Sequence, residues 1–193
     1  MNRHRDCSDE ALLAHFARGR QDAFTELVRR YGAAIKGFAI RMLHSPEQAE
    51  EIYVETFLRV ANSRGRWELR GTVRGYLFTI ARRLCLDELR HRQVQRRAYD
   101  TVVEIDWAWS PPSPEARCAL GQTADALERA LARLPSEHRD VLLMRTIHGL
   151  SAEETALATG LSEDQVYSQL SYARRRLREL MEAPRREEAR WAR

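Results

Sequence analysis

The sequence predicts an all-α protein of two small helical domains joined by an acidic, proline-containing linker, with a helix-turn-helix in the C-terminal domain. Apolar residues recur at helical spacing in both halves of the chain, and no alternating strand pattern competes with them. Residues 97–121 lose this period and contain three prolines, which is typical of a linker. We therefore expect an N-terminal domain at 1–96, the linker at 97–121, a C-terminal domain at 122–182 and a basic tail at 183–193.

Four helices are expected in the N-terminal domain, separated by turns that glycine and proline mark. They span Ser8 to Arg18, Asp22 to Leu43, Pro46 to Asn62 and Thr72 to Gln93. The third helix has apolar residues on two faces: Ile52 and Phe57 lie on one, whereas Val54 and Leu58 lie on the other beside Glu51. An apolar face flanked by charge favours a docked protein partner. Burial of that face under a neighbouring helix is an equally weighted alternative.

The segment between the third and fourth helices, residues 62–72, mixes arginines with Trp67 and glycines. Aromatic rings stack on splayed bases, arginines hold phosphates, and an amide such as that of Asn62 can bond a base edge, so this loop favours single-stranded nucleic acid. A lone loop tryptophan is more often a lid over a hydrophobic core, which leaves a second interpretation open. The fourth helix is expected to bury one face and to present arginines, including Arg82 and Arg83, on the other.

Two helix starts follow each other closely in the C-terminal domain. Ser151 precedes Glu154 and Ser162 precedes Gln165, each the pattern of a capping box. Between them Gly160 can adopt the positive φ that ends the first helix, so the pair predicts a helix-turn-helix. Two further helices are expected before it, from Thr123 to Arg133 and from Ser136 to His148.

The outer face of the second helix of this motif carries hydrogen-bonding side chains and positive charge, as a helix that binds in the major groove requires. It holds Ser168, Ser171, Tyr172 and Arg175. A packed helical hairpin with a solvated outer face is the less favoured alternative.

Composition and charge exclude several classes of protein. The chain has 193 residues and a net charge of +4, but its arginines cluster apart from its acidic residues, which indicates at least two different partners. No apolar run approaches the roughly 20 residues of a membrane span, so we expect no membrane insertion and a cytoplasmic protein. The cysteines, Cys7, Cys85 and Cys118, lie too far apart for a zinc site or a disulfide framework. No cluster of residues completes a catalytic site, so neither enzymatic activity nor a metal or cofactor is expected.

Four segments occur in one order along nearly the whole chain: Asp22-Ala-Phe-Thr-Glu-Leu27, Ala49 to Arg59, Gly75 to Arg90, and Leu134 to Leu142. Together they resemble the extracytoplasmic-function sigma factors of bacterial RNA polymerase. The resemblance implies that the first domain docks on the clamp helices of the polymerase β′ subunit and melts the promoter −10 element. It further implies that the second domain binds the −35 element as duplex beside the β flap, and that an anti-sigma protein covers these surfaces. No bond is broken in this activity, so it is not catalysis.

The resemblance assigns three sets of residues on this sequence. The residues assigned to polymerase binding are Glu51, Val54, Glu55 and Leu58. Contacts to the single-stranded −10 element fall to Asn62, Arg64, Arg66, Trp67, Arg70, Thr79, Arg82 and Arg83. Contacts to the −35 duplex fall to Ser162, Gln165, Tyr167, Ser168, Gln169, Ser171, Tyr172 and Arg175.

Two departures from the family pattern keep other hypotheses open. The family usually has a glutamine where Val54 stands, and its recognition helix commonly reads Val-Lys-Ser-Arg-Leu where this chain has Val166-Tyr-Ser-Gln-Leu170. Each lost phosphate contact would flatten the salt dependence of duplex binding by about one unit. Besides a promoter-specific sigma factor, the sequence therefore allows a sigma-like decoy or adaptor that binds an anti-sigma factor or polymerase without initiating. A free-standing helix-turn-helix repressor is the third hypothesis.

Overall fold

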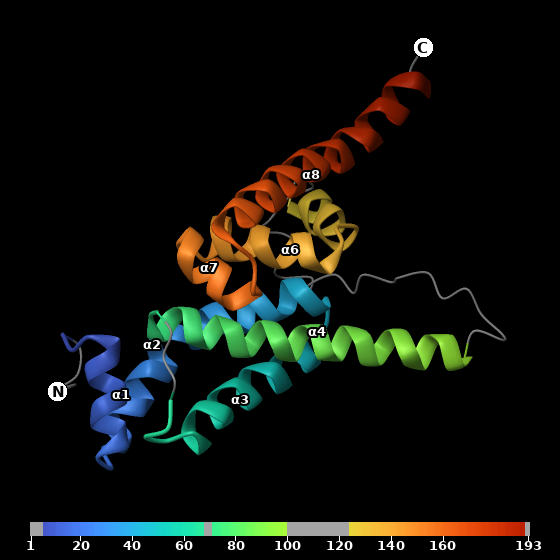
Figure 1. Cartoon of the computed structure of the whole chain (residues 1–193). Coiled ribbons are helices and arrows are strands. Elements are labelled where there is room, and N and C mark those ends of the chain that lie inside the picture. The colour runs from blue at the N-terminus through green and yellow to red at the C-terminus, as the bar shows by residue number, and fades with distance from the viewer. Residues whose placement is uncertain (1–5, 68–70, 100–123, 192–193) are drawn as a thin grey trace.

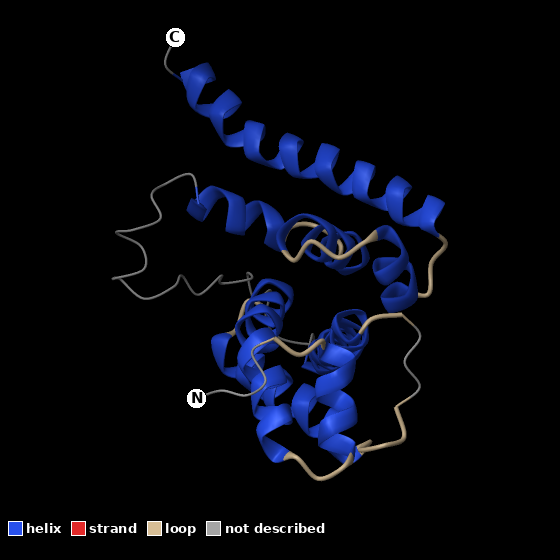
Figure 2. Cartoon of the chain, turned by 90° about the vertical axis from the view of Figure 1, so that its left-hand side faces the viewer, coloured by secondary structure: helices blue, strands red, loops and turns tan. Residues whose placement is uncertain are grey.

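The computed structural model describes residues 6–67, 71–99 and 124–191, and all regular structure within these ranges is helical (Figure 1, Figure 2). The N-terminal domain comprises α1 (Asp9–Ala17), α2 (Gln21–Leu43), α3 (Pro46–Asn62) and α4 (Val73–Tyr99). The C-terminal domain begins with helical residues 124–132 and continues with α6 (Ser136–Leu142), η1 (Leu143–Ile147), α7 (Ala152–Thr159) and α8 (Glu163–Trp191). The all-α fold and its two small helical domains are as predicted, and most of the predicted linker lies outside the described residues.

Short polar side chains set the starts of the N-terminal helices. The Ser8 hydroxyl accepts a backbone N–H at the start of α1, and the Ser45 hydroxyl does the same at the start of α3. Pro46 takes the first position of α3, where its missing N–H leaves no hydrogen bond unmade. His44 ends α2 with a φ of 53°, a left-handed conformation that turns the chain directly into α3.

The core of the N-terminal domain lies around α2, which packs against α1, α3 and α4. Phe38 of α2 and Phe78 of α4 meet edge to face, with ring centroids 5.5 Å apart. On α3, Phe57 is buried as expected, whereas Val54 is 45% and Leu58 49% exposed. The second apolar face of α3 is thus not covered by a neighbouring helix in the part of the chain that the structure describes.

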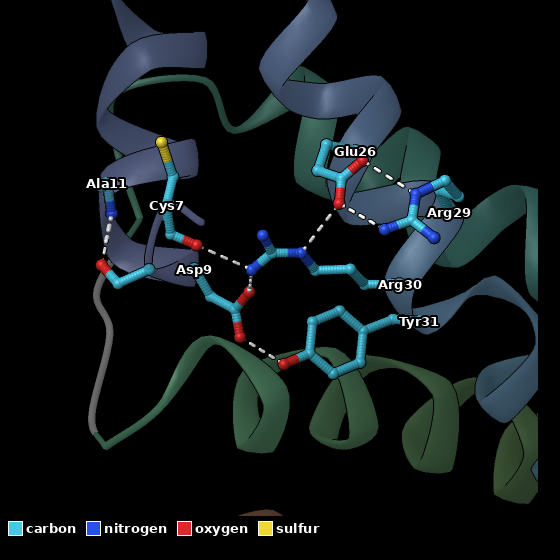
Figure 3. Close-up of polar contacts among 8 residues, drawn as sticks. Cys7, Asp9, Ala11, Glu26, Arg29, Arg30 and Tyr31 are labelled. Carbon is cyan, nitrogen blue, oxygen red and sulfur yellow. Dashed lines mark hydrogen bonds and ion pairs between the residues drawn. The ribbon is translucent and has the colours of Figure 1, made fainter. Parts of the chain in front are cut away.

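A cluster of charged side chains fastens α1 to α2 (Figure 3). The Asp9 carboxylate accepts a hydrogen bond from Arg30 Nη1 at 2.7 Å and another from the Tyr31 hydroxyl. Arg30 also donates to Glu26 at 3.1 Å and to the carbonyl oxygen of Cys7 at 2.9 Å. Glu26 is buried, and these charge-assisted bonds offset the cost of removing its carboxylate from water. Burial and the bond to Asp9 raise the pKa of Tyr31.

The helix-turn-helix has the predicted capping chemistry. The Ser151 hydroxyl accepts from the Glu154 N–H at 2.9 Å, and the Glu154 carboxylate accepts from the Ser151 N–H at 2.7 Å. The Ser162 hydroxyl and the Gln165 amide oxygen make the corresponding bonds at 3.2 and 2.8 Å. Gly160 ends α7 with a φ of 75°. Both capping boxes and the glycine turn are therefore confirmed.

Two features of the C-terminal helices differ from the sequence-based expectation. The single helix predicted from Ser136 to His148 is an α-helix that passes into a π-helical turn at Leu143. Such a turn inserts into a helix without a distinct apolar period, so a pattern of apolar residues does not predict it. In addition, α8 continues to Trp191, so the backbone of the predicted basic tail at 183–193 is helical nearly to its end.

The two domains pack against each other (Figure 1). Four residues of the second domain, Leu143, Met144, Leu150 and Ala158, belong to the same buried cluster as the core of the first domain. A second, smaller cluster lies beneath α8 and contains Leu131, Leu134, Val141, Leu142, Val166, Leu170 and Ala173. The helix α4 therefore packs on the other helices of the first domain through one face and on α7 of the second domain through another.

Candidate nucleic-acid interface

A basic cavity of about 420 Å³ lies between the C-terminal end of α3 and α4. It is lined by Arg59, Asn62, Ser63, Arg66, Tyr76, Thr79, Ile80 and Arg83. Four of these, Asn62, Arg66, Thr79 and Arg83, are among the residues predicted to contact single-stranded DNA. The fold thus joins predicted residues from a loop and from a helix in one site.

The other four lining residues, Arg59, Ser63, Tyr76 and Ile80, were not predicted. Arg59 Nε donates to the Glu55 carboxylate at 2.8 Å, one helical turn earlier. Since Glu55 is a predicted polymerase contact, this ion pair connects the cavity to the outer surface of α3. Tyr76 and Ile80 could have been found from their spacing, because residues three and four apart share a helix face with Thr79 and Arg83.

The cavity offers both charge and hydrogen-bonding groups to a ligand. Three guanidinium groups line it, which suits phosphate oxygens, and the Tyr76 ring provides a surface on which a base can stack. The Thr79 hydroxyl donates to the Gly75 carbonyl oxygen at 2.8 Å. Its proton is therefore already used, and Thr79 can only accept a hydrogen bond from a ligand.

Trp67, which follows the cavity residue Arg66 in the sequence, covers the edge of the core. Its indole Nε1 donates to the carbonyl oxygen of Val60 at 2.9 Å, and its ring centroid is 6.1 Å from that of Phe16. The Arg64 guanidinium lies 4.9 Å from the Phe16 ring centroid. These contacts match the lid interpretation that the sequence left open, and they position the loop that follows α3. Arg70 lies outside the described residues.

Arg82 does not join the cavity, although the sequence places it on the same helix face as Arg83. Its Nε donates to Asp140 Oδ2 at 2.5 Å, and its Nη1 lies 3.5 Å from the carbonyl oxygen of Ala158. The Arg82 side chain is only 17% exposed. The expectation that it faces solvent is wrong for this structure, because the second domain packs on this side of α4.

The outer face of α8 presents most of the predicted duplex contacts to solvent. Tyr167 is 53% and Tyr172 39% exposed, and the side chains of Ser168, Ser171 and Arg175 are exposed as well. Ser162 and Gln165 stand at the start of this face, where their side chains form the capping box. The helix therefore offers a continuous polar surface from its first turn onward.

Neighbouring side chains hold the two tyrosines of this face. The Arg145 guanidinium lies 5.9 Å from the Tyr167 ring centroid, and the His138 ring lies 4.4 Å from that of Tyr172. Gln169 differs from its neighbours in being half-buried, and its Oε1 has no hydrogen-bond partner in the described part of the chain. It is therefore the predicted duplex contact with the least access to a groove.

The predicted polymerase contacts form a separate surface on α3. Val54 and Leu58, one turn apart, are half exposed, and Glu51 and Glu55 lie beside them. Apolar side chains ringed by carboxylates are typical of a protein-binding surface.

Within the described ranges, no group of three or more histidine, cysteine, aspartate or glutamate side chains could hold a metal ion. None of the described helices is long and apolar enough to cross a membrane. Cys85 is buried, and burial raises the pKa of its thiol to about 12, so it is unreactive at neutral pH.

Comparison with known proteins gives consistent matches. Residues 27–95 match the family model described as Sigma-70 region 2, and residues 124–177 match Sigma-70, region 4. The RNA polymerase sigma factor CarQ of Myxococcus xanthus is 33% identical over 172 residues, which cover 88% of this chain and 95% of CarQ. The ECF RNA polymerase sigma factor SigM of Mycobacterium tuberculosis is 32% identical over 180 residues, covering 93% of this chain and 87% of SigM.

Two solved structures share the fold. One is the sigma factor RpoE in complex with the anti-sigma factor NepR from Bartonella quintana, with a TM-score of 0.69 and 23% identity. It matches 82% of this chain and 96% of the RpoE chain. The other is CnrH in complex with the cytosolic domain of CnrY, with a TM-score of 0.68 and 24% identity, covering 91% of this chain and 97% of the other.

Proposed function

Because this chain belongs to the extracytoplasmic-function sigma factors of RNA polymerase, we propose that each of its three surfaces makes one of the contacts of promoter-dependent initiation. The protein is an alternative sigma factor, which binds core RNA polymerase and directs it to specific promoters. Its relatives are sigma factors, which are not enzymes. We infer that this chain has no catalytic activity or cofactor of its own and acts in the cytoplasm.

The cavity between α3 and α4 receives a base of the non-template −10 strand. The observation that carries this assignment is the convergence of three arginines, an amide and an aromatic ring on one cavity of about 420 Å³. A base that leaves the duplex stack must be held by stacking and by contacts to its edge and its phosphate. Binding only the splayed strand favours opening of the promoter, with least cost at A·T-rich steps.

The outer face of α8 contacts the −35 element in the major groove. Its polar surface and its two exposed tyrosines support this role. This helix carries fewer positive charges than the family pattern. We therefore expect its affinity for duplex DNA to depend less on salt concentration.

The Val54–Leu58 surface of α3 binds the β′ clamp helices, and an anti-sigma protein competes for the same surfaces. The exposed apolar pair supports the first contact, since adjacent apolar side chains with a polar rim are a common form of protein-binding surface. The structure of the related fold RpoE with the anti-sigma factor NepR supports the second.

Run-off transcription tests the function. Core bacterial RNA polymerase is incubated with a genomic promoter library, with and without this protein, and the transcript starts are sequenced. Discrete new starts that share two upstream elements are expected. Polymerase binding without new starts would favour the decoy hypothesis. Duplex binding by a dimer without polymerase would favour the repressor.

Cavity variants test the −10 assignment within the same assay. Arg83→Gln is expected to reduce opening of the −10 region, measured by permanganate reactivity of unpaired thymines, while polymerase binding is unchanged. Arg90→Gln is the matched control, because Arg90 lies on the same helix, outside the cavity, with its side chain 72% exposed. Equal loss of opening in both variants would contradict the assignment.

A further inference from the structure

The first turns of α8, residues 163–173, contain no arginine or lysine. Their exposed side chains are acidic at Glu163 and Asp164 and neutral from Gln165 onward. The first cation of the helix is Arg174, and four of the five residues 174–178 are arginines. The N-terminal residues of a recognition helix contact base edges, whereas contacts to phosphates position the protein without selecting a sequence. The part of α8 that is suited to contact bases is therefore the part that has no positive charge.

This composition disfavours guanine as the base that α8 contacts. In the major groove guanine presents two acceptors, N7 and O6, whose commonest partner is an arginine or a lysine. A carboxylate accepts hydrogen bonds only, so Glu163 and Asp164 cannot bond these acceptors. The first turns of the helix thus offer guanine no charged, bidentate donor.

The middle of the outer face of α8 combines short hydroxyl side chains with an aromatic ring and an arginine: Ser168, Ser171, Tyr172 and Arg175. Residues three, four and seven positions apart lie on one side of a helix, so these side chains face a groove together. The serines are short, which allows the helix to approach the base edges closely. Tyr172 is 39% exposed and presents part of its ring to a ligand. Tyr167 lies at the edge of this face.

Two neighbours hold the Tyr172 ring in place. The His138 ring centroid lies 4.4 Å from that of Tyr172 with 42° between the ring planes, and the Arg175 guanidinium carbon lies 5.5 Å from the Tyr172 centroid. His138 belongs to α6, which packs against α8 within the same domain. A side chain that is already held by its neighbours loses less freedom on binding than a mobile one. The Tyr172 ring is therefore preorganised as an apolar contact surface.

We propose that Tyr172 selects thymine in the −35 element by contact of its ring with the thymine C5-methyl group, and that the core of this element is rich in A·T pairs. The assignment rests on the proposed function, in which α8 contacts the −35 duplex. Among the four bases, thymine presents a methyl group in the major groove, and apolar or aromatic side chains contact it. The hydroxyls of Ser168 and Ser171 bond the neighbouring base edges, and the arginines of residues 174–178 hold phosphates. His138 acts as a positioning residue for Tyr172.

Selection from random duplexes tests the base preference. The full chain, alone and saturated with core RNA polymerase, is incubated with duplexes that carry a random window of about 10 base pairs, one turn of DNA. Core polymerase alone gives the background, and the bound duplexes are sequenced. Enriched windows are expected to be rich in A·T pairs and to have no fixed guanine. Enrichment of a guanine, or of no sequence at all, would overturn the proposal.

Removal of single methyl groups tests the contact itself. Each thymine of the enriched duplex is replaced in turn by deoxyuridine, which lacks the C5-methyl group but still pairs with adenine. At one position the replacement should weaken binding about fourfold, the worth of one buried methyl group, as measured by fluorescence anisotropy. Tyr172→Ala should bind the two duplexes equally at this position, whereas Tyr172→Phe keeps the ring and should still distinguish them. Equal affinity of the unmodified chain for thymine and deoxyuridine at every position would overturn the proposal.

A change of specificity gives a second, independent readout. Tyr172→Arg should transfer the preference at the same position from thymine to guanine, because arginine pairs with guanine O6 and N7. Arg174→Gln is the control, since Arg174 is exposed and lies half a turn further along α8. It should weaken binding to all duplexes alike and keep the thymine preference. Circular dichroism of each variant verifies that helix content is retained. A thymine preference that survives in Tyr172→Arg would contradict the assignment of Tyr172.

Failure of the proposed function has a different signature from failure of this inference. Selective binding of A·T-rich windows without promoter-dependent transcript starts would contradict the sigma activity and leave the selection of thymine by Tyr172 established. Transcript starts that share an upstream element with a fixed guanine, and that Tyr172→Ala leaves unchanged, would do the reverse.

Discussion

The imidazole of His148, from the second domain, lies 5.0 Å from the ring centroid of Phe78 and 5.9 Å from that of Phe38, both in the first domain. Burial in this aromatic setting lowers the pKa of His148 to about 4, and the charges of Arg41 and Arg74 act in the same direction. The side chain is thus neutral at pH 7, and protonation in place would put a charge between two phenylalanines. The domain contact is therefore sensitive to acid.

His44 lies on the same interface and behaves alike. Its Nε2 is 3.1 Å from Arg139 Nη1, and burial, Arg139 and Arg92 lower its pKa to about 4. Asp140 opposes the two histidines, because burial and Glu137 raise its pKa to about 6 against the effect of Arg82. Two further carboxylates lie at the contact. Glu154 bonds Thr72, and although burial acts to raise its pKa, the bonds to Thr72 and Ser151 and the charge of Arg74 lower it. Glu128 pairs with Arg41 at 3.2 Å.

Acidification from pH 6.5 toward pH 4 is expected to open the domains. In this window the separated form protonates both histidines, at an ordinary pKa of about 6.5, while the closed form does not. The closed form takes up one proton at Asp140, whereas the separated form takes up two at the histidines. Opening of the domains therefore binds about one proton net. The radius of gyration should therefore rise as the pH falls. His44→Asn with His148→Gln should abolish the rise, because Asp140, the remaining group of the three, takes up its proton in the closed form. Asparagine suits the left-handed backbone at position 44. A pH response that both replacements leave intact would contradict this account.

Replacement of Trp67 should separate a structural from a functional contribution. Trp67→Phe keeps most of the packing on Phe16 but leaves the Val60 carbonyl oxygen without its donor, a loss of about 1 kcal/mol in the free energy of unfolding. Trp67→Ala also loses the packing and should cost about 2 kcal/mol or more. Urea unfolding measures both values. Trp67→Ala should reduce opening of the −10 region more than it reduces polymerase binding. Equal loss of both would show that the loop after α3 does not bind the separated strand.

A charge on the exposed face of α3 should abolish polymerase binding without unfolding the protein. Leu58→Glu places a carboxylate on a surface that is already half exposed. The free energy of unfolding should therefore change by only about 0.5 kcal/mol or less. Affinity for core polymerase, measured by surface plasmon resonance, should fall about tenfold or more because the apolar contact is lost. Val94→Glu is the control, since Val94 is 65% exposed and lies on α4, away from this surface. Equal binding by both variants would exclude α3 as the docking helix.

The two capping boxes allow a matched comparison. Ser151→Ala and Ser162→Ala each remove one cap and should each lower the free energy of unfolding by about 1 kcal/mol. Only Ser162 lies at the start of α8, the helix proposed to contact the −35 duplex. We expect Ser162→Ala alone to weaken promoter binding beyond its effect on stability, as measured by gel shift of the holoenzyme. Indistinguishable gel shifts would show that the start of α8 does not touch DNA.

Tyr167 occupies a position at which the family pattern has a lysine. Tyr167→Lys should increase affinity for duplex DNA and steepen the dependence of log K on log salt by about one unit, because one more phosphate is neutralised. Binding at several salt concentrations gives the slope. Tyr167→Gln is the uncharged control and should leave the slope unchanged. A slope that lysine does not alter would mean that position 167 points away from the phosphate backbone.

Local signals explain why so much of the fold could be predicted. Serines, a proline and a glycine in the linking turns set the bounds of α1, α3 and α7, and each acts within four residues of its own position. The two capping boxes were predictable for the same reason, whereas exposure of the second apolar face of α3 was one of two equally weighted alternatives. Half of the residues that line the cavity between α3 and α4 were predictable, because a loop composition and a helix face can be recognised separately.

The remaining features depend on contacts between distant parts of the chain. The pairing of Arg82 with Asp140 joins residues 58 positions apart, and nothing in the neighbourhood of either residue specifies the other. The π-helical turn at Leu143 is likewise a product of packing, since it lies where the second domain enters the core of the first. The predicted solvent-facing arginine was therefore wrong where tertiary packing overrode helical periodicity.

Arg139 Nη1 donates to the carbonyl oxygen of Met42, which lies 97 positions earlier in the sequence. This contact between the domains can therefore form only after most of the chain has been synthesised. Chains are made from the N-terminus, at about 5–20 residues per second, and domains generally fold as units during synthesis. For several seconds the nascent first domain therefore lacks the bond from Arg139 to the Met42 carbonyl oxygen and the pairing of Arg82 with Asp140, while its own Arg92 can already bond the Leu43 carbonyl oxygen. The closed arrangement is the last event in the maturation of the protein, and a polymerase that met the nascent chain earlier would encounter it already open.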